Sequence, residues 1–180
     1  MRSPSSVLPR FLFALLALSG AGVAHARPPE ALACAIMSAP AGLDARVADV
    51  VASREVDKGS SALTDLQAVV DQCAADQFMP PKEREAYFTY TLGRMARDVL
   101  DGRLAAKGLS SALIDKALDI GPGNANNPAE KVTEGDMRRV ATELAVAGTD
   151  PKQVTPEGWT LVTAWIVATA NMFDGLRNID

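Results

Sequence analysis

Residues 155–173 read TPEGWTLVTAWIVATANMF, and this stretch decides the expected fold. Thr155 suits the capping position of a helix, Pro156 suits its first turn, and Glu157 places an acid at the positive end of the helix dipole. The apolar side chains that follow would lie on nearly every side of such a helix, which is typical of a helix surrounded by others. Membrane insertion is the alternative, but the apolar stretch is short and contains several polar residues. We therefore expect a central core helix here.

Upstream of this stretch, the chain reads as further helical segments, because β-branched residues never alternate with polar ones over a useful length. The expected helices cover residues 29–38, 43–58, 61–76, 81–107, 111–120 and 133–148. Thr133 followed by Asp136 resembles a helix-capping pair. No internal repeat and no long linker divides residues 27–180. The sequence predicts an all-α protein, a single compact bundle of about six to seven helices around the apolar C-terminal helix.

The longest expected helix, residues 81–107, shows a clear apolar stripe. Its members recur at three- and four-residue spacing, as a core-facing side requires. They are Phe88, Leu92, Met95 and Val99. Gly93 and Gly102 interrupt good helix formers, and each is expected to weaken the helix by up to about 1 kcal/mol relative to alanine.

Residues 1–26 have the three parts of an export signal. A basic region, Met1–Arg10, precedes an apolar run at residues 11–18, and small residues surround His25 before a predicted cut after Ala26. A membrane anchor is the alternative, but the run is well short of the roughly 20 residues that span a bilayer. A lipoprotein site at Cys34 is disfavoured because polar and proline residues separate it from the run. We expect a periplasmic or secreted protein with no stable membrane insertion after cleavage.

Removal of the leader changes the composition. The full chain has 18 basic and 22 acidic residues, and the leader contains two of the basic ones, no acid and the only histidine. The remaining 154 residues have a formal charge of −6, since 16 bases face 22 acids. Without histidine, Ser-His-Asp catalysis, Cys-His catalysis and imidazole metal sites are excluded. The acidic balance also disfavours nucleic acid as a partner.

Cys34 and Cys73 are the two cysteines of the chain. In an oxidising compartment an even count favours a disulfide between them, with two buried thiols as the alternative. A bridge closing a loop of about 40 residues would stabilise the protein by roughly 3–4 kcal/mol in the chain-entropy model. The spacing is unlike CxxC, so the expected role is structural.

One segment has the length of a calcium-binding loop. It runs from Asp119 to Glu130, but Gly121 and Gly123 occupy ligand positions and Asn124 stands where the sharp turn needs glycine. We therefore expect a plain helix–helix connection and no metal. No cofactor is expected either, because the chain has neither a CxxCH haem motif nor a phosphate-binding glycine loop.

A polar surface on the longest helix is the candidate binding site. Tyr87, Tyr90, Arg94 and Arg97 recur at three- and four-residue spacing, opposite the apolar stripe and alongside Glu83 and Asp101. Arginine forks and tyrosine hydroxyls could bind a carboxylate, a phosphate or an acidic patch. The alternative is a solvated face held by Arg94–Asp98 and Arg97–Asp101 pairs, each contributing a few tenths of a kcal/mol.

The leading functional hypothesis is an exported non-enzymatic helical module that recognises a protein or a small ligand through its surface. One alternative is a small hydrolase or lyase that uses two carboxylates as acid and base. Its candidates are Glu83, Glu85, Asp98, Asp101, Glu130, Glu134 and Asp136. Another alternative is a structural envelope or stress protein.

Overall fold

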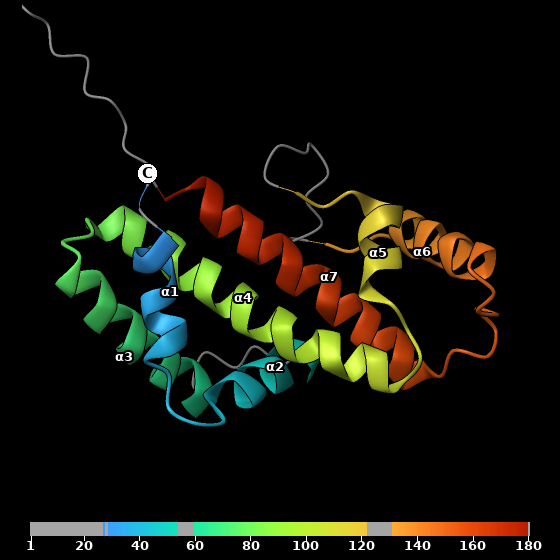
Figure 1. Cartoon of the computed structure of the whole chain (residues 1–180), viewed down its shortest axis with the longest axis horizontal. Helices are drawn as coiled ribbons and strands as arrows, with labels where there is room; N and C mark the ends of the chain where they lie inside the picture. The colour runs from blue at the N-terminus through green and yellow to red at the C-terminus, as the bar shows by residue number, and fades with distance from the viewer. Residues whose placement is uncertain (1–26, 28, 54–59, 122–130, 180) are drawn as a thin grey trace, which may run out of the picture.

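The structure, a computed structural model, describes residues 27, 29–53, 60–121 and 131–179. This part of the chain contains seven helices and no strand, which confirms the predicted all-α class (Figure 1). The helices are α1 (Pro29–Met37), α2 (Leu43–Ser53), α3 (Ser61–Asp76), α4 (Pro81–Ala106), α5 (Ser111–Leu118), α6 (Glu134–Val146) and α7 (Pro156–Arg177). All seven contribute buried side chains to one apolar core.

Local capping chemistry sets the starts of the last two helices. At α6 the Thr133 hydroxyl accepts a hydrogen bond from the Asp136 N–H at 3.1 Å, and the Asp136 carboxylate accepts one from the Thr133 N–H at 2.8 Å. This reciprocal pair is a capping box, as the sequence predicts. At α7 the Thr155 hydroxyl accepts from the Gly158 N–H at 3.1 Å, and Pro156 follows in the first turn.

Helices α4 and α7 run antiparallel, side by side, through the middle of the molecule (Figure 1). Two glycines allow this close approach. A Cβ at Gly93 on α4 would lie 2.6 Å from the Ala168 carbonyl oxygen, and one at Gly175 on α7 would lie 2.6 Å from the Ala86 carbonyl oxygen. In addition to its expected cost in helix propensity, Gly93 therefore has a packing role, because the missing side chain makes room for the α7 backbone.

Helix α7 is buried on most of its circumference. From Leu161 to Met172, every side chain except those of Val167 and Asn171 is buried. Besides α4, it packs against α2 and α5. The predicted central apolar C-terminal helix is confirmed. No described helix, α7 included, is long and apolar enough to span a bilayer.

Helices α1 and α3 lie at one end of the α4–α7 pair, α2 lies beside its middle, and α5 and α6 lie at the other end (Figure 1). Helices α1, α2 and α3 pack against α4, with α1 and α3 also in contact with each other. At the other end α5 packs closely on α6, and Lys116 of α5 forms an ion pair with Glu143 of α6. The two surfaces of α4 that matter for function therefore have different neighbours.

Candidate functional site

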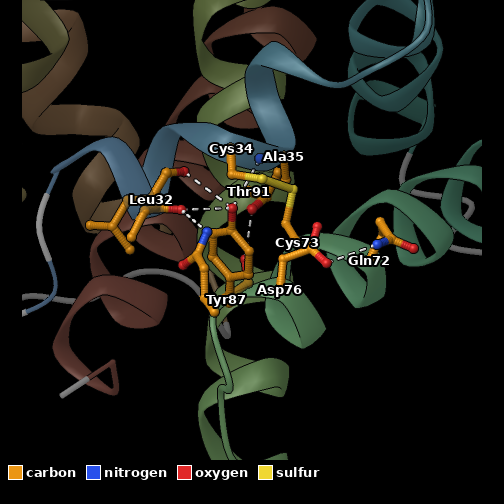
Figure 2. The surroundings of a disulfide bond; sticks show 10 residues. Leu32, Cys34, Ala35, Gln72, Cys73, Asp76, Tyr87 and Thr91 are labelled. Carbon is orange, nitrogen blue, oxygen red and sulfur yellow. Dashed lines mark hydrogen bonds between the residues drawn. A yellow bond between two sulfur atoms is a disulfide. The ribbon is translucent and has the colours of Figure 1, made fainter.

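A disulfide ties α1 to α3, as predicted. Cys34 and Cys73 are bonded, with their Cα atoms 6.0 Å apart and 39 positions apart in the sequence. Cys73 is buried in the core stripe of α3, whereas Cys34 is only partly buried. The bond holds the short α1 across the beginning of α4 (Figure 2).

Tyr87 lies beneath α1, next to the disulfide (Figure 2). Its side chain is fully buried, its hydroxyl accepts a hydrogen bond from the Ala35 N–H at 3.0 Å, and it lies 3.2 Å from the Ala31 carbonyl oxygen as a donor. Burial raises the pKa of Tyr87; the bond from Ala35 opposes this and the nearby Tyr90 adds to it. The prediction of a shared exposed face is wrong for Tyr87, because α1 covers this side of α4.

Further polar contacts fasten the chain ahead of α1 to the α3–α4 connection. The Arg27 Nε donates to Glu83 Oε2 at 2.7 Å, and the Gln77 side-chain amide donates to the Ala31 carbonyl at 2.9 Å. Glu83, which the sequence places on the candidate face, is therefore engaged in an ion pair. We call this region, comprising α1, α3 and the start of α4, the clasped end.

The other three predicted residues lie on a partly exposed part of α4. The Arg94 Nε donates to Asp98 Oδ2 at 2.9 Å, and this bond is the main reason why the pKa of Arg94 is raised. Arg97 lies 4.0 Å from the Asp98 carboxylate, so its ion-pair partner differs from the Asp101 expected from helical spacing. Tyr90 also raises the pKa of Arg94, which places Tyr90 in the same network.

Arg97 also contacts an aromatic ring of α7. Its guanidinium carbon lies 5.3 Å from the centre of the Trp165 ring, within the range of a cation–π interaction. Trp165 is 1% exposed. The Nε of Arg97 and the Nε1 of Trp165 are both buried, and neither has a hydrogen-bond acceptor among the described residues. Buried polar atoms without partners are uncommon in folded proteins, and the described residues contain two more outside this pair, Gln77 Oε1 and Thr169 Oγ1.

Beside this pair lies a groove of about 500 Å³ between α4, α5 and α7. Its lining residues are Arg97, Asp98, Asp101, Ser111, Ala112, Asp115 and Trp165. Asp101 and Asp115 are exposed and have no ion-pair partner in the described part of the chain. The described residues contain no group of three His, Cys, Asp or Glu that could hold a metal ion. The groove is thus acidic, with its carboxylates spread out.

The carboxylates of the enzyme alternative are mostly dispersed. Asp98 and Asp101 line the same groove, and Glu130 lies outside the described residues. Asp136 belongs to the capping box of α6; burial raises its pKa, but hydrogen bonds from Thr133 and an ion pair with Arg139 outweigh this, so the pKa is lowered. A general acid needs a raised pKa, which makes Asp136 unsuitable for that role.

Most of the segment with the length of a calcium-binding loop, residues 122–130, lies outside the described part of the chain. Asp119 caps the C-terminus of α5 in a left-handed conformation, with φ at +51°. In the structure, Asp119 therefore ends helix α5.

Sequence reasoning names Arg97, Asp98 and Asp101 of the groove but misses Ser111, Ala112, Asp115 and Trp165. Trp165 reads as core from its neighbours, and its buried state agrees with that. Nothing in the local pattern of α5 indicates that Asp115 lines the same groove as Trp165, because that depends on how α5 packs. No protein-family model, no curated protein and no solved structure matches this chain.

Proposed function

We propose that this protein is an exported, non-enzymatic binding module that holds a small ligand in the groove between α4, α5 and α7. The observation that carries the proposal is the groove itself, which has a volume of about 500 Å³ and is lined by charged side chains of α4 and α5 and by Trp165 of α7. Sites for small molecules usually enclose about 300–1,000 Å³ and orient the ligand with a few polar groups. Both properties favour recognition of a ligand in this groove over a featureless solvated surface.

Two features support export to the periplasm or the exterior. Residues 1–26 have the composition of a signal peptide, and the remaining chain carries the Cys34–Cys73 disulfide. Disulfides persist in oxidising compartments and are rare in the cytosol. The disulfide lies away from the groove lining, so its proposed role is to stabilise the fold.

The carboxylate hydrolase or lyase remains the second candidate, because Asp98 and Asp101 line one groove. Against it, Asp98 is ion-paired with Arg94 at 2.9 Å. The Arg94 guanidinium therefore already occupies an oxygen of this carboxylate. The arrangement therefore suits charge recognition better than acid–base chemistry.

Native mass spectrometry of the protein isolated from the exported fraction would test this proposal. We expect the mass of residues 27–180 with the disulfide formed, and a retained low-mass ligand. Ala112→Trp fills the groove and should abolish retention, whereas Ala75→Trp, at an exposed alanine of α3, should not. Groove binding would be refuted if both variants retained the ligand equally. It would also be refuted if the wild-type protein retained no ligand, either as isolated or after incubation with extracts of the exported fraction. Recovery of a chemically altered ligand would favour the enzyme.

A further inference from the structure

We propose that this protein self-associates by placing Phe78 of one copy into an apolar pocket on the surface of a second copy. Phe78 lies in the connection between α3 and α4, and its side chain is 90% exposed. The receiving pocket is lined by residues of α1, α2, the connection between them, and α4, and we call it the α1–α4 pocket. This contact goes beyond the proposed function and does not depend on a ligand in the groove.

Phe78 occupies a backbone position at the end of α3 that glycine usually fills. Its N–H donates to the Ala75 carbonyl at 3.1 Å, and the N–H of the next residue, Met79, donates to the Ala74 carbonyl at 2.9 Å. These are the two bonds of a Schellman motif, whose residue after the cap takes a left-handed conformation. The φ of Phe78 is accordingly +54°. This conformation is unfavourable for a bulky L-residue, because its Cβ crowds the following carbonyl oxygen.

Two other helices of the same chain show the usual occupant of this position. Helices α4 and α6 end in the same pair of backbone bonds, with Gly108 and Gly148 in the left-handed conformation. At the end of α3, Phe78 replaces the permissive glycine, and its exposed ring gains almost no burial within the monomer in return. A strained residue with an unburied aromatic ring points to a contact outside the monomer.

The α1–α4 pocket has the size and the lining to accept a phenyl ring. Its volume is about 220 Å³, whereas apolar cavities of about 150 Å³ already bind benzene. Five of its eight lining residues are apolar: Ile36, Ala39, Pro40, Ala41 and Met95. The α1–α2 and α3–α4 connections lie at separate places on the outside of the molecule (Figure 1). Because Phe78 is exposed, it leaves the pocket of its own molecule open to a second copy.

Charge favours a second copy over a lipid surface. Lys82, exposed four positions after Phe78, and Asp44, at the pocket, carry opposite charges and have no ion-pair partner in the described part of the chain. Anionic lipid headgroups would instead meet the exposed Asp71 and Asp76 of α3 on a chain whose residues 27–180 have a formal charge of −6. In a twofold dimer each copy would both donate and accept a ring. The small contact area predicts a weak, reversible dimer.

Sedimentation velocity of the disulfide-bonded protein, in a concentration series up to the millimolar range, would test this inference. We expect a reversible shift from monomer to dimer. Phe78→Gly should weaken the association at least tenfold while raising the melting temperature, since it removes the backbone strain and leaves the fold intact. Val146→Ala is the matched control, because it trims another exposed apolar side chain, on α6, and should leave the association unchanged.

The pocket is tested by Ala41→Trp, which fills it from an exposed position and should also weaken the association at least tenfold. A mixture of the Phe78→Gly and Ala41→Trp proteins should form a heterodimer, because one retains the pocket and the other retains the ring. A wild-type protein that stays monomeric, a Phe78→Gly protein that dimerises like the wild type, or a mixture without heterodimer would overturn this inference. Binding of the wild type, but not of Phe78→Gly, to vesicles of phosphatidylcholine and phosphatidylglycerol without self-association would also overturn it and assign Phe78 to a membrane contact.

Discussion

The hydrogen bonding of polar side chains differs between the two ends of the α4–α7 pair. At the clasped end, the Tyr87 hydroxyl is buried and bonded to the backbone of α1, and a disulfide holds α1 in place. At the groove end, which we define as α5 with the adjoining turns of α4 and α7, the buried N–H groups of Arg97 and Trp165 lack acceptors. The same helix, α4, supplies Tyr87 to one end and Arg97 to the other.

The difference teaches where a binding function can reside in this fold. Where α1 covers α4, the Tyr87 hydroxyl, the Glu83 carboxylate and the Gln77 amide nitrogen bond within the protein, whereas Gln77 Oε1 is buried without a partner among the described residues. Where α5 leaves a groove beside α4, two donors and two carboxylates have no partners in the described structure. The clasped end thus holds the contacts that stabilise the fold, and the groove end is where we propose that recognition takes place.

The largest expected effect comes from removing the disulfide. Cys34→Ser/Cys73→Ser should lower the free energy of unfolding by about 3–4 kcal/mol, because the bond closes a loop of about 40 residues in the unfolded chain. Urea unfolding monitored by circular dichroism would measure the loss. Ligand binding at the groove should be retained below the unfolding transition, since no groove residue belongs to α1 or α3.

Native-state hydrogen exchange would sharpen the same comparison. In the double serine variant, the amides of α1 should exchange through a local opening that requires less free energy than global unfolding. Amides of α5 and α6 should continue to follow the global value. An equal loss of amide protection in α1, α5 and α6 would show that the clasped end does not unfold independently.

The next effect concerns the helix pair shared by both ends. Gly93→Ala should destabilise the protein by about 3 kcal/mol, because the added Cβ meets backbone atoms of α7, which cannot rotate away. Gly102→Ala on the same helix is the matched control, since nothing lies within 4 Å of its Cβ position. That variant should be neutral or more stable by up to about 1 kcal/mol. Thermal unfolding of the two variants would separate a helix-propensity effect from a packing effect.

These two glycines also show how far the sequence could predict the fold. Helical periodicity, proline positions and capping residues place the helices closely: residues 61–76 are expected as a helix, and α3 is Ser61–Asp76. The packing partner of each helix face is a tertiary property. Gly93 and Gly102 look alike in the sequence, yet only Gly93 meets the backbone of another helix.

The same reasoning explains the candidate site. Spacing on α4 predicts that Tyr87 and Arg97 share one face, but helical spacing does not say which part of that face a neighbour covers. Helix α1 covers Tyr87, which is fully buried. Of the predicted stripe, Met95 is buried, whereas Phe88, Leu92 and Val99 are partly buried. Asp115 and Trp165 join Arg97 only through the packing of three helices.

A smaller effect is expected at the clasped end from Tyr87→Phe. Loss of the hydroxyl removes its bonds to α1 and should cost about 2 kcal/mol at neutral pH. Since the pKa of Tyr87 is raised in the folded state, its contribution is complete below the unfolded value of about 10 and is lost as the pH rises through the folded value. The stability gap between wild type and variant should therefore narrow above pH 10. A constant gap in urea titrations across that range would show that Tyr87 ionises normally.

The smallest effect tests the groove end through α6, which supports α5. Asp136→Ala removes the acceptor of the Thr133 N–H and should lower the free energy of unfolding by about 1 kcal/mol, whereas Glu134→Ala, at an exposed neighbour, should change it by less than about 0.5 kcal/mol. The pKa of Asp136 is lowered by folding, so its contribution is complete above the unfolded value of about 3.9 and is lost as the pH falls through the folded value. The gap should thus close in acid, opposite to the alkaline narrowing at Tyr87. If the stability differences for Tyr87→Phe and Asp136→Ala both disappeared in acid, or both in alkali, the contacts assigned to Tyr87 and Asp136 would be wrong.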